Sequence, residues 1–375
     1  MNKTRLATLV ALTCYAGVVG AEVTINGFAS IKAGMASNGD TLYGYTDDID
    51  FKNESLFAVQ VQSDLGEKLS VTAQLLARGV NDFDAEFEWA FLTYQINESW
   101  RLNAGRLRTP FYKYSDFRDV GYAYDWLRTP QSVYDLGFNT IEGLSLYHST
   151  SFGDIQSNLQ FVFGAYDGDA RVLGTQAPAQ IDQITGISWE LSQDWIAFRL
   201  AYLVGDVSIQ SAQLSGLTNT LNTLGLTAVS KDIDFDKDQG SFFGLGLNID
   251  RNDWLLVSEY THVEVKDSFY AEQDSYYVSL GHRFGSYTPY VSFEKDDDAA
   301  KPEIYARLPA QLPPQLTAGV KGLVDSQFFD NNTWNLGLRY DFHPSAAFKV
   351  QYSWAEDQTT KRKDNLMALG VDLVF

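Results

Sequence analysis

Apolar residues recur at every second position along most of this chain. The clearest case is the C-terminus, where Met367, Leu369, Val371, Leu373 and Phe375 alternate with small or polar residues. A period of two is typical of a β-strand with one apolar face. The same period appears at 23–31, 69–75, 155–163, 334–342 and 348–354. The alternation therefore predicts an all-β protein.

The second face of these strands carries Gln, Asn, Arg, Lys and Gly, which indicates contact with water. One apolar face and one wet face fit a barrel with lipid outside and water inside. Aromatic residues make up 14% of the chain and recur at strand ends, as in the girdles at membrane interfaces. A mean hydropathy of −0.20 argues against a protein built from apolar spans of about 20 residues.

Connections along the chain alternate between short and long. Seven short turns rich in Gly, Asn, Asp and Ser are predicted at 64–68, 97–99, 152–154, 192–194, 250–253, 284–286 and 343–345. Eight other connections fall near 38–48, 81–84, 109–139, 167–180, 206–239, 265–270, 297–329 and 357–363. This rhythm predicts a 16-stranded antiparallel transmembrane β-barrel with short periplasmic turns and long extracellular loops. Leucines at helical spacing in the fifth loop predict a short amphipathic helix there: Leu214, Leu217, Leu221 and Leu224.

The N-terminal segment, residues 1–21, is predicted to be a signal peptide cleaved after Ala21, which leaves 22–375 as the barrel domain. Basic residues precede its apolar stretch, and small residues form the cleavage site. The single cysteine, Cys14, leaves with this segment, which excludes a disulfide framework and a cysteine nucleophile in the mature chain. A formal charge of −20 argues against nucleic-acid binding.

Three features of the chain match one known family. Phe375 ends the chain, with Leu373, Val371 and Leu369 at alternate positions before it. The segment 105–110, Gly-Arg-Leu-Arg-Thr-Pro, closes the fifth predicted strand, and the third long connection follows it. In these features the chain resembles the 16-stranded porins of Gram-negative outer membranes, in particular the gammaproteobacterial type. The C-terminal pattern is similar to the sorting signal that the barrel-assembly machinery reads.

The resemblance implies an outer-membrane protein in contact with lipid and lipopolysaccharide, forming a homotrimer around channels for ions and small hydrophilic solutes. It also implies that the third loop, about 109–139, folds back into the lumen. The second loop departs from the family because Asn81–Asp84 is too short for the latch that many trimeric porins use. A trimer would then rest on contacts between barrel walls.

The third loop carries seven aromatic rings, which a surface loop would expose: Phe111, Tyr112, Tyr114, Phe117, Tyr122, Tyr124 and Trp126. Packing inside a wide barrel would bury them and leave four carboxylates to line a constriction: Asp116, Asp119, Asp125 and Asp135. Lys32 and Arg78 occupy inward positions on the wall, and the resemblance places Arg106 and Arg108 inward as well. Opposed acidic and basic groups would sort ions by charge. The alternative is that these charges form ion pairs that hold the folded loop.

No catalytic motif, cofactor motif or metal-ligand spacing stands out. The four histidines are scattered, and there is no nucleophile elbow or phosphate loop. Acidic runs at 47–50, 232–238 and 296–298 are interpreted as solvated loop charge. The alternative is that they bind a divalent cation weakly and so bridge to lipopolysaccharide phosphate. The sequence therefore predicts a passive, weakly to moderately cation-preferring channel rather than an enzyme. An outer-membrane phospholipase or protease, and a structural or adhesin barrel, are the alternatives.

Overall fold

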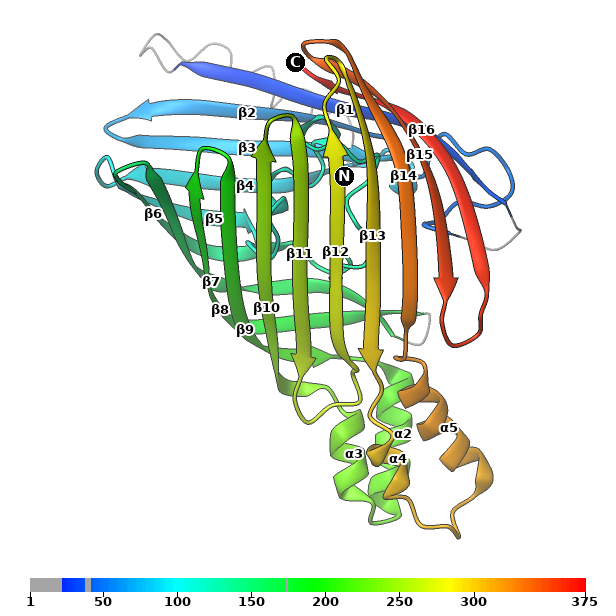
Figure 1. The fold of residues 1–375 in the computed structure, drawn as a ribbon. Coiled ribbons are helices and arrows are strands. Elements are labelled where there is room, and N and C mark those ends of the chain that lie inside the picture. Colours follow the sequence, from blue (N-terminus) through cyan, green and yellow to red (C-terminus); the bar gives the residue numbers. More distant parts are fainter. Residues whose placement is uncertain (1–21, 38–41, 173–174) are drawn as a thin grey trace, which may run out of the picture.

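The computed structural model describes residues 22–37, 42–172 and 175–375, and the predicted signal peptide lies outside these ranges. Sixteen antiparallel strands form a closed barrel in which each strand pairs with the next and β1 pairs with β16 (Figure 1). The predicted strand number and architecture are confirmed. Closure pairs Phe28 with Val374 and Ala36 with Leu366, so the two ends of the chain complete the sheet.

The strands are long, as a tilted crossing of a membrane requires. The first half comprises β1 (Val23–Ala36), β2 (Leu56–Gly66), β3 (Leu69–Arg78), β4 (Ala85–Gln95), β5 (Trp100–Arg108), β6 (Thr140–Phe152), β7 (Ile155–Val172) and β8 (Thr175–Gln193). The second half comprises β9 (Ile196–Ile209), β10 (Asp236–Arg251), β11 (Trp254–Val265), β12 (Glu272–His282), β13 (Tyr287–Ala299), β14 (Asp330–His343), β15 (Ala346–Asp357) and β16 (Lys363–Val374). All seven predicted short turns fall between these strands.

The fourth long connection differs from its prediction. A loop was expected near 167–180, and that expectation is wrong. β7 and β8 continue as a paired ribbon to Val172 and Thr175, with Asp167 opposite Gln180. The ribbon is stabilised because Ala177 and Ala179 are buried on one of its faces.

Helices gather beyond the outer end of the barrel (Figure 1). The fifth loop forms α2 (Ala212–Thr223) and α3 (Thr227–Ile233), and the seventh forms α4 (Glu303–Ala306) and α5 (Pro314–Asp325). Their apolar faces share one cluster, built mainly from Leu214, Leu221, Val229, Ile233, Phe235, Phe269, Ile304, Val320, Leu323 and Val324. The helix predicted from leucine spacing is confirmed as α2, whereas α4 and α5 were not anticipated. No helix within the described ranges is long and apolar enough to cross a bilayer.

The two faces of the barrel differ in chemistry. Large apolar side chains such as Phe57, Phe163 and Leu336 are exposed on the outside, where lipid would cover them. Inside, buried polar groups bond to one another: Asn335 donates to Ser292 at 3.1 Å and accepts from Gln351 at 2.9 Å. The alternation predicted an inner face that is wet throughout, and the structure differs from this prediction. The inner face carries an apolar patch on β7 to β10, formed by Val162, Ile184, Ala201, Leu203 and Phe242, which packs against the third loop.

Candidate functional site

Loop 3, residues 109–139, joins β5 to β6 and lies inside the barrel (Figure 1). The strand that leads into it contains Gly105 at φ +139°, a conformation that L side chains rarely adopt. A Cβ atom at Gly105 would lie 2.4 Å from the carbonyl oxygen of Ala90. Glycine therefore allows this strand to approach β4 closely just before the chain turns inward. Within the loop, two single turns of 3₁₀ helix form, η3 (Ser115–Phe117) and η4 (Gly121–Ala123).

Aromatic rings bury loop 3 against the wall. Five of the seven rings predicted to be buried are buried: Phe111, Tyr112, Tyr114, Tyr124 and Trp126. Trp126 meets Tyr277 of β12 edge to face at 5.4 Å and donates from Nε1 to Ser279 at 2.8 Å. Phe117 is exposed and Tyr122 is half-buried. Each buried aromatic ring removes roughly 150–250 Å² from water, so this cluster is a major part of the loop's attachment.

A charged cluster ties the first half of loop 3 to β3, β4 and β5. Arg108 donates to Asp119 at 2.8 Å and lies 2.6 Å from Glu88, while Arg78 donates to Glu88 at 2.8 Å and to Asp119 at 3.3 Å. Burial opposes ionisation of Asp119, but the charges of Arg108 and Arg78 outweigh it and hold the pKa of this carboxyl at about 2. Asp119 thus contacts both arginines directly and does not face them across an aperture.

The middle of loop 3 is held by two cations from the last strands. Lys349 is fully buried and donates to the carbonyls of Gly121, Tyr124 and Trp126 at 2.6–2.8 Å. Its ammonium also lies 2.9 Å from the carboxylate of Asp372. Gly121 fits here because a Cβ atom would lie 2.1 Å from Asp372. In the same way, Arg339 donates to the carbonyls of Tyr122 and Tyr124, each at 2.9 Å. Wall cations therefore supply hydrogen-bond donors to the carbonyls of this irregular stretch of the loop.

Further contacts hold both ends of the loop. Arg128 makes a bidentate pair with Glu54 of the first long connection, at 2.8 and 2.7 Å. Burial disfavours the charge of Glu54, but Arg128 outweighs it and lowers the pKa of this carboxyl. Arg199 of β9 donates to the carbonyls of Pro110 and Phe111. On β11, the carboxylate of Glu259 accepts from the backbone nitrogen of Lys113 at 2.7 Å. These contacts leave loop 3 attached around most of the wall.

The other predicted site residues are placed as follows. Asp116 and Asp135 are exposed and have no hydrogen bond or ion pair among the described residues, whereas Asp125 lies 3.8 Å from Arg339. Lys32 is buried beside Gly370 of β16. Arg106 is half-exposed, 3.7 Å from Glu142. It borders a polar cavity of about 310 Å³ together with Arg78, Arg118, Asp119, Glu86 and Glu88.

Enclosure by the barrel raises the pKa of both exposed carboxyls, Asp116 and Asp135, above the ordinary value, although nearby arginines partly offset the effect. Among the described residues, no group of three or more His, Cys, Asp or Glu is arranged to hold a metal ion.

The residues that sequence reasoning missed are Glu54, Glu88, Arg128, Arg199, Glu259, Arg339 and Lys349. The signal for Arg339 and Lys349 was present, because both alternate with apolar residues and so occupy inward positions.

A closed barrel of 16 strands with a loop packed in its interior defines a transmembrane β-barrel of the channel type. The sequence matches the family model for Gram-negative porins over residues 7–372, so the chain belongs to the Gram-negative porin family. It is accordingly an outer-membrane channel protein.

Solved structures show the same fold at low sequence identity. The channel DcaP of Acinetobacter baumannii is 12% identical, with a TM-score of 0.60 over 96% of this chain and 99% of that one. The anion-selective porin of Comamonas acidovorans is 11% identical, with a TM-score of 0.58 over 95% and 100%. OmpT, an outer-membrane protein of Vibrio cholerae, is 10% identical, with a TM-score of 0.58 over 96% and 99%. No curated protein matches the sequence significantly.

Proposed function

We propose that this porin is a passive, water-filled channel for ions and small hydrophilic solutes, with a weak to moderate preference for cations. One observation carries the preference. Arg78, Arg108 and Arg339 on the wall contact carboxylates directly, whereas Asp116 and Asp135 on loop 3 are exposed and unpaired among the described residues. Free carboxylates in a narrow lumen raise the local concentration of small cations.

The preference is modest because loop 3 also carries cations. Lys113 lies over the ring of Tyr114, and Arg118 donates to the carbonyl of Tyr134 at 2.6 Å. No carboxylate in the part of the chain that the structure describes forms an ion pair with either side chain. The net charge of −20 adds a long-range attraction for cations that salt screens within about 10 Å at 0.1 M. The preference should therefore be strongest at low salt.

The reversal potential in a salt gradient tests the preference. The double variant Asp116→Asn/Asp135→Asn should shift the reversal potential toward that of an anion-selective channel, most clearly at low salt. The matched control is Asp154→Asn, which removes an exposed carboxylate from the turn between β6 and β7. An unchanged reversal potential in the double variant, or an equal shift in the control, contradicts the assignment of these carboxylates. A bilayer without conductance but with phospholipid or peptide hydrolysis would favour the enzyme alternative.

We also propose a homotrimer assembled through barrel walls. The second loop of the chain is too short to reach a neighbouring subunit. Asp82 of this loop forms an ion pair with Lys52 of the first loop in the same chain. Mass by light scattering in detergent tests the trimer, and a monomer without heat treatment contradicts it. N-terminal sequencing of the mature protein tests cleavage after Ala21.

Contacts with lipopolysaccharide and with the barrel-assembly machinery are proposals of the same kind. For the second, the C-terminal residues Leu369, Val371, Leu373 and Phe375 are the proposed signal. The ring of Phe375 is 61% exposed and stacks on Phe57 at 5.9 Å, which leaves its outer face free for recognition.

A further inference from the structure

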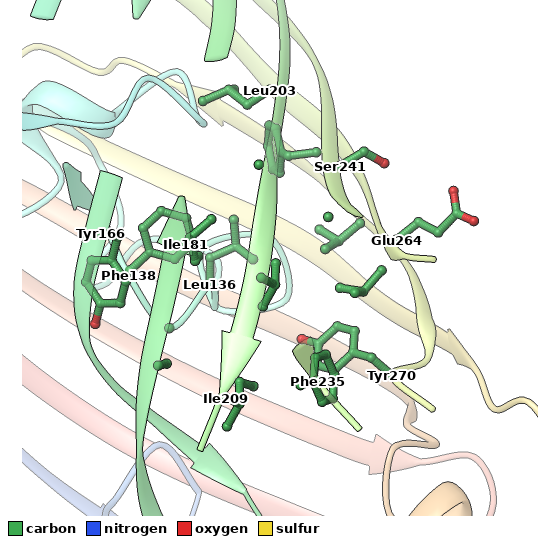
Figure 2. Close-up of a pocket in the computed structure, with 18 of the residues that line it drawn as sticks. Leu136, Phe138, Tyr166, Ile181, Leu203, Ile209, Phe235, Ser241, Glu264 and Tyr270 are labelled. Atoms are coloured by element: carbon green, nitrogen blue, oxygen red, sulfur yellow. The ribbon is translucent and has the colours of Figure 1, made fainter. Parts of the chain in front are cut away.

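A second, larger cavity of about 730 Å³ lies between loop 3 and the wall formed by β7 to β11. Figure 2 shows its apolar lining, which includes Leu136 and Phe138 of loop 3, Ile181 and Leu203 of the wall, and Phe235 of the fifth loop. Its volume falls within the range of cavities that enclose small organic ligands, roughly 300–1,000 Å³. An apolar hollow of this size is unexpected inside a channel for hydrophilic solutes.

Aromatic contacts support the walls of this cavity. Phe138 packs on Tyr166 with ring centroids 4.9 Å apart, and Phe111 meets Phe242 at 4.8 Å. At the outer end, Phe235 meets Phe269 edge to face at 5.2 Å, within the cluster that holds the helices of the fifth and seventh loops. The cavity is therefore built from packed rings on several elements, on the side of loop 3 that lies toward the helices.

The charged groups that border the cavity are all acidic. They are Asp135, Asp169 and Glu264, and no Lys, Arg or His is among the described residues that line it. In Figure 2 the carboxylate of Glu264 points away from the apolar side chains. Asp169 pairs with Pro178, on the opposite face of the β7–β8 ribbon from the buried Ala177 and Ala179, so Asp135 is the carboxylate that can meet a ligand in the cavity. The side chain of Asp135 is exposed, so it can meet a ligand that enters from water. An apolar hollow with acidic groups at its border selects a cation that carries an apolar body.

We infer that this cavity binds amphipathic cations, such as an ammonium group attached to one or two aromatic rings, on their way through the channel. The inference rests on the proposed function, and it names a substrate class for the same lumen. The rings of the ligand would occupy the space among Leu136, Phe138 and Leu203, while its ammonium would lie near Asp135. Aromatic carboxylates of the same size would be repelled, and sugars would leave the apolar surface uncovered.

Fluorescence of 1-naphthylmethylammonium with the purified full-length protein in detergent measures binding without any need for conductance. We expect saturable binding of this probe. Its affinity should be at least about tenfold higher than that of 1-naphthoate, which has the opposite charge, and than that of methylammonium, which lacks the rings and is measured as a competitor. In a planar bilayer the same probe should interrupt the ion current at concentrations at which methylammonium does not.

Variants of the lining test the location. Ala179→Phe would fill part of the cavity from β8 and should weaken binding by about tenfold. Asp135→Asn should weaken binding by about fivefold at low salt. The matched control is Asp167→Asn, which removes an exposed carboxylate of β7 that does not line the cavity, and this variant should bind the probe normally. Heat-modified migration checks that each variant forms a barrel.

The possible failures are distinguishable. Normal conductance with no saturable binding, or with binding that is unchanged in both Ala179→Phe and Asp135→Asn, overturns this inference and leaves the channel intact. Equal binding of 1-naphthoate also overturns it, because the cavity would then select by apolar surface alone. Absent conductance together with saturable, variant-sensitive binding would instead contradict the proposed passive channel.

Discussion

The attachment of loop 3 by Asp119 can be tested by changing this carboxylate to an amide. In Asp119→Asn, Arg108 and Arg78 lose the charge that they contact at 2.8 and 3.3 Å. Removing one partner of a buried ion pair costs about 3–5 kcal/mol. Glu88 still contacts both arginines, so we expect the lower end, about 3 kcal/mol.

This free energy acts on local detachment of the loop rather than on unfolding of the barrel. About 3 kcal/mol shifts the equilibrium between the attached and detached states by about 150-fold. The contacts of Lys349 and Arg339 with the middle of the loop remain, so detachment should be confined to its first half. We therefore expect more current noise in single channels. Cleavage by trypsin after Arg118 should accelerate by at least about tenfold, because proteolysis tracks the open population.

The matched control for this experiment is Asp116→Asn, three residues earlier on the same loop. Asp116 is exposed and has no partner among the described residues, so its amide variant should leave noise and cleavage unchanged. The reasoning is refuted if Asp119→Asn behaves as the unmodified protein does, or if both variants loosen the loop equally. Unaltered heat-modified migration of Asp119→Asn would show that the barrel itself still forms.

Three further predictions concern pH, the interior and the C-terminus. Because the pKa of Asp119 is depressed, its ion pairs stabilise the loop above the ordinary carboxyl pKa of about 3.9, and this stability is lost as the pH falls through about 2. The pKa of Asp116 is raised, so Asp116 loses its charge at a higher pH than Asp119 does. As the pH is lowered, the cation preference should therefore decline before the loop noise increases. Reversal potentials and current noise recorded across a pH series check this order. Lys349→Met should destabilise the barrel by about 3–5 kcal/mol in heat-modification assays, because the substitution removes the ion-pair partner of the buried Asp372 carboxylate. Adding Asp372→Asn should partly restore the stability. Deleting Phe375 should lower outer-membrane levels strongly while barrels that do insert keep nearly normal thermal stability; normal levels would remove the assembly role.

The sequence alone determined the architecture because a strand repeats every two residues. Alternation at 334–342, 348–354 and 367–375 places each side chain on one of two faces, and short polar turns fix the antiparallel order. The inward positions of Arg339 and Lys349 follow from the same period. The aromatic content of loop 3 also indicated that it lies inside, since Phe111, Tyr112 and their neighbours need burial.

Only the tertiary structure decided what the inward charges do. Which strand lies opposite each part of loop 3 depends on barrel closure, which brings Asp372 and Lys349 to Gly121, more than 200 positions away in the chain. Local pattern cannot report contacts over such separations. The same closure makes Asp119, which borders the polar cavity, an attachment point for Arg108 and Arg78, and leaves Asp116 exposed. The apolar cavity likewise exists because residues of loop 3, the wall and the fifth loop meet only in the folded barrel.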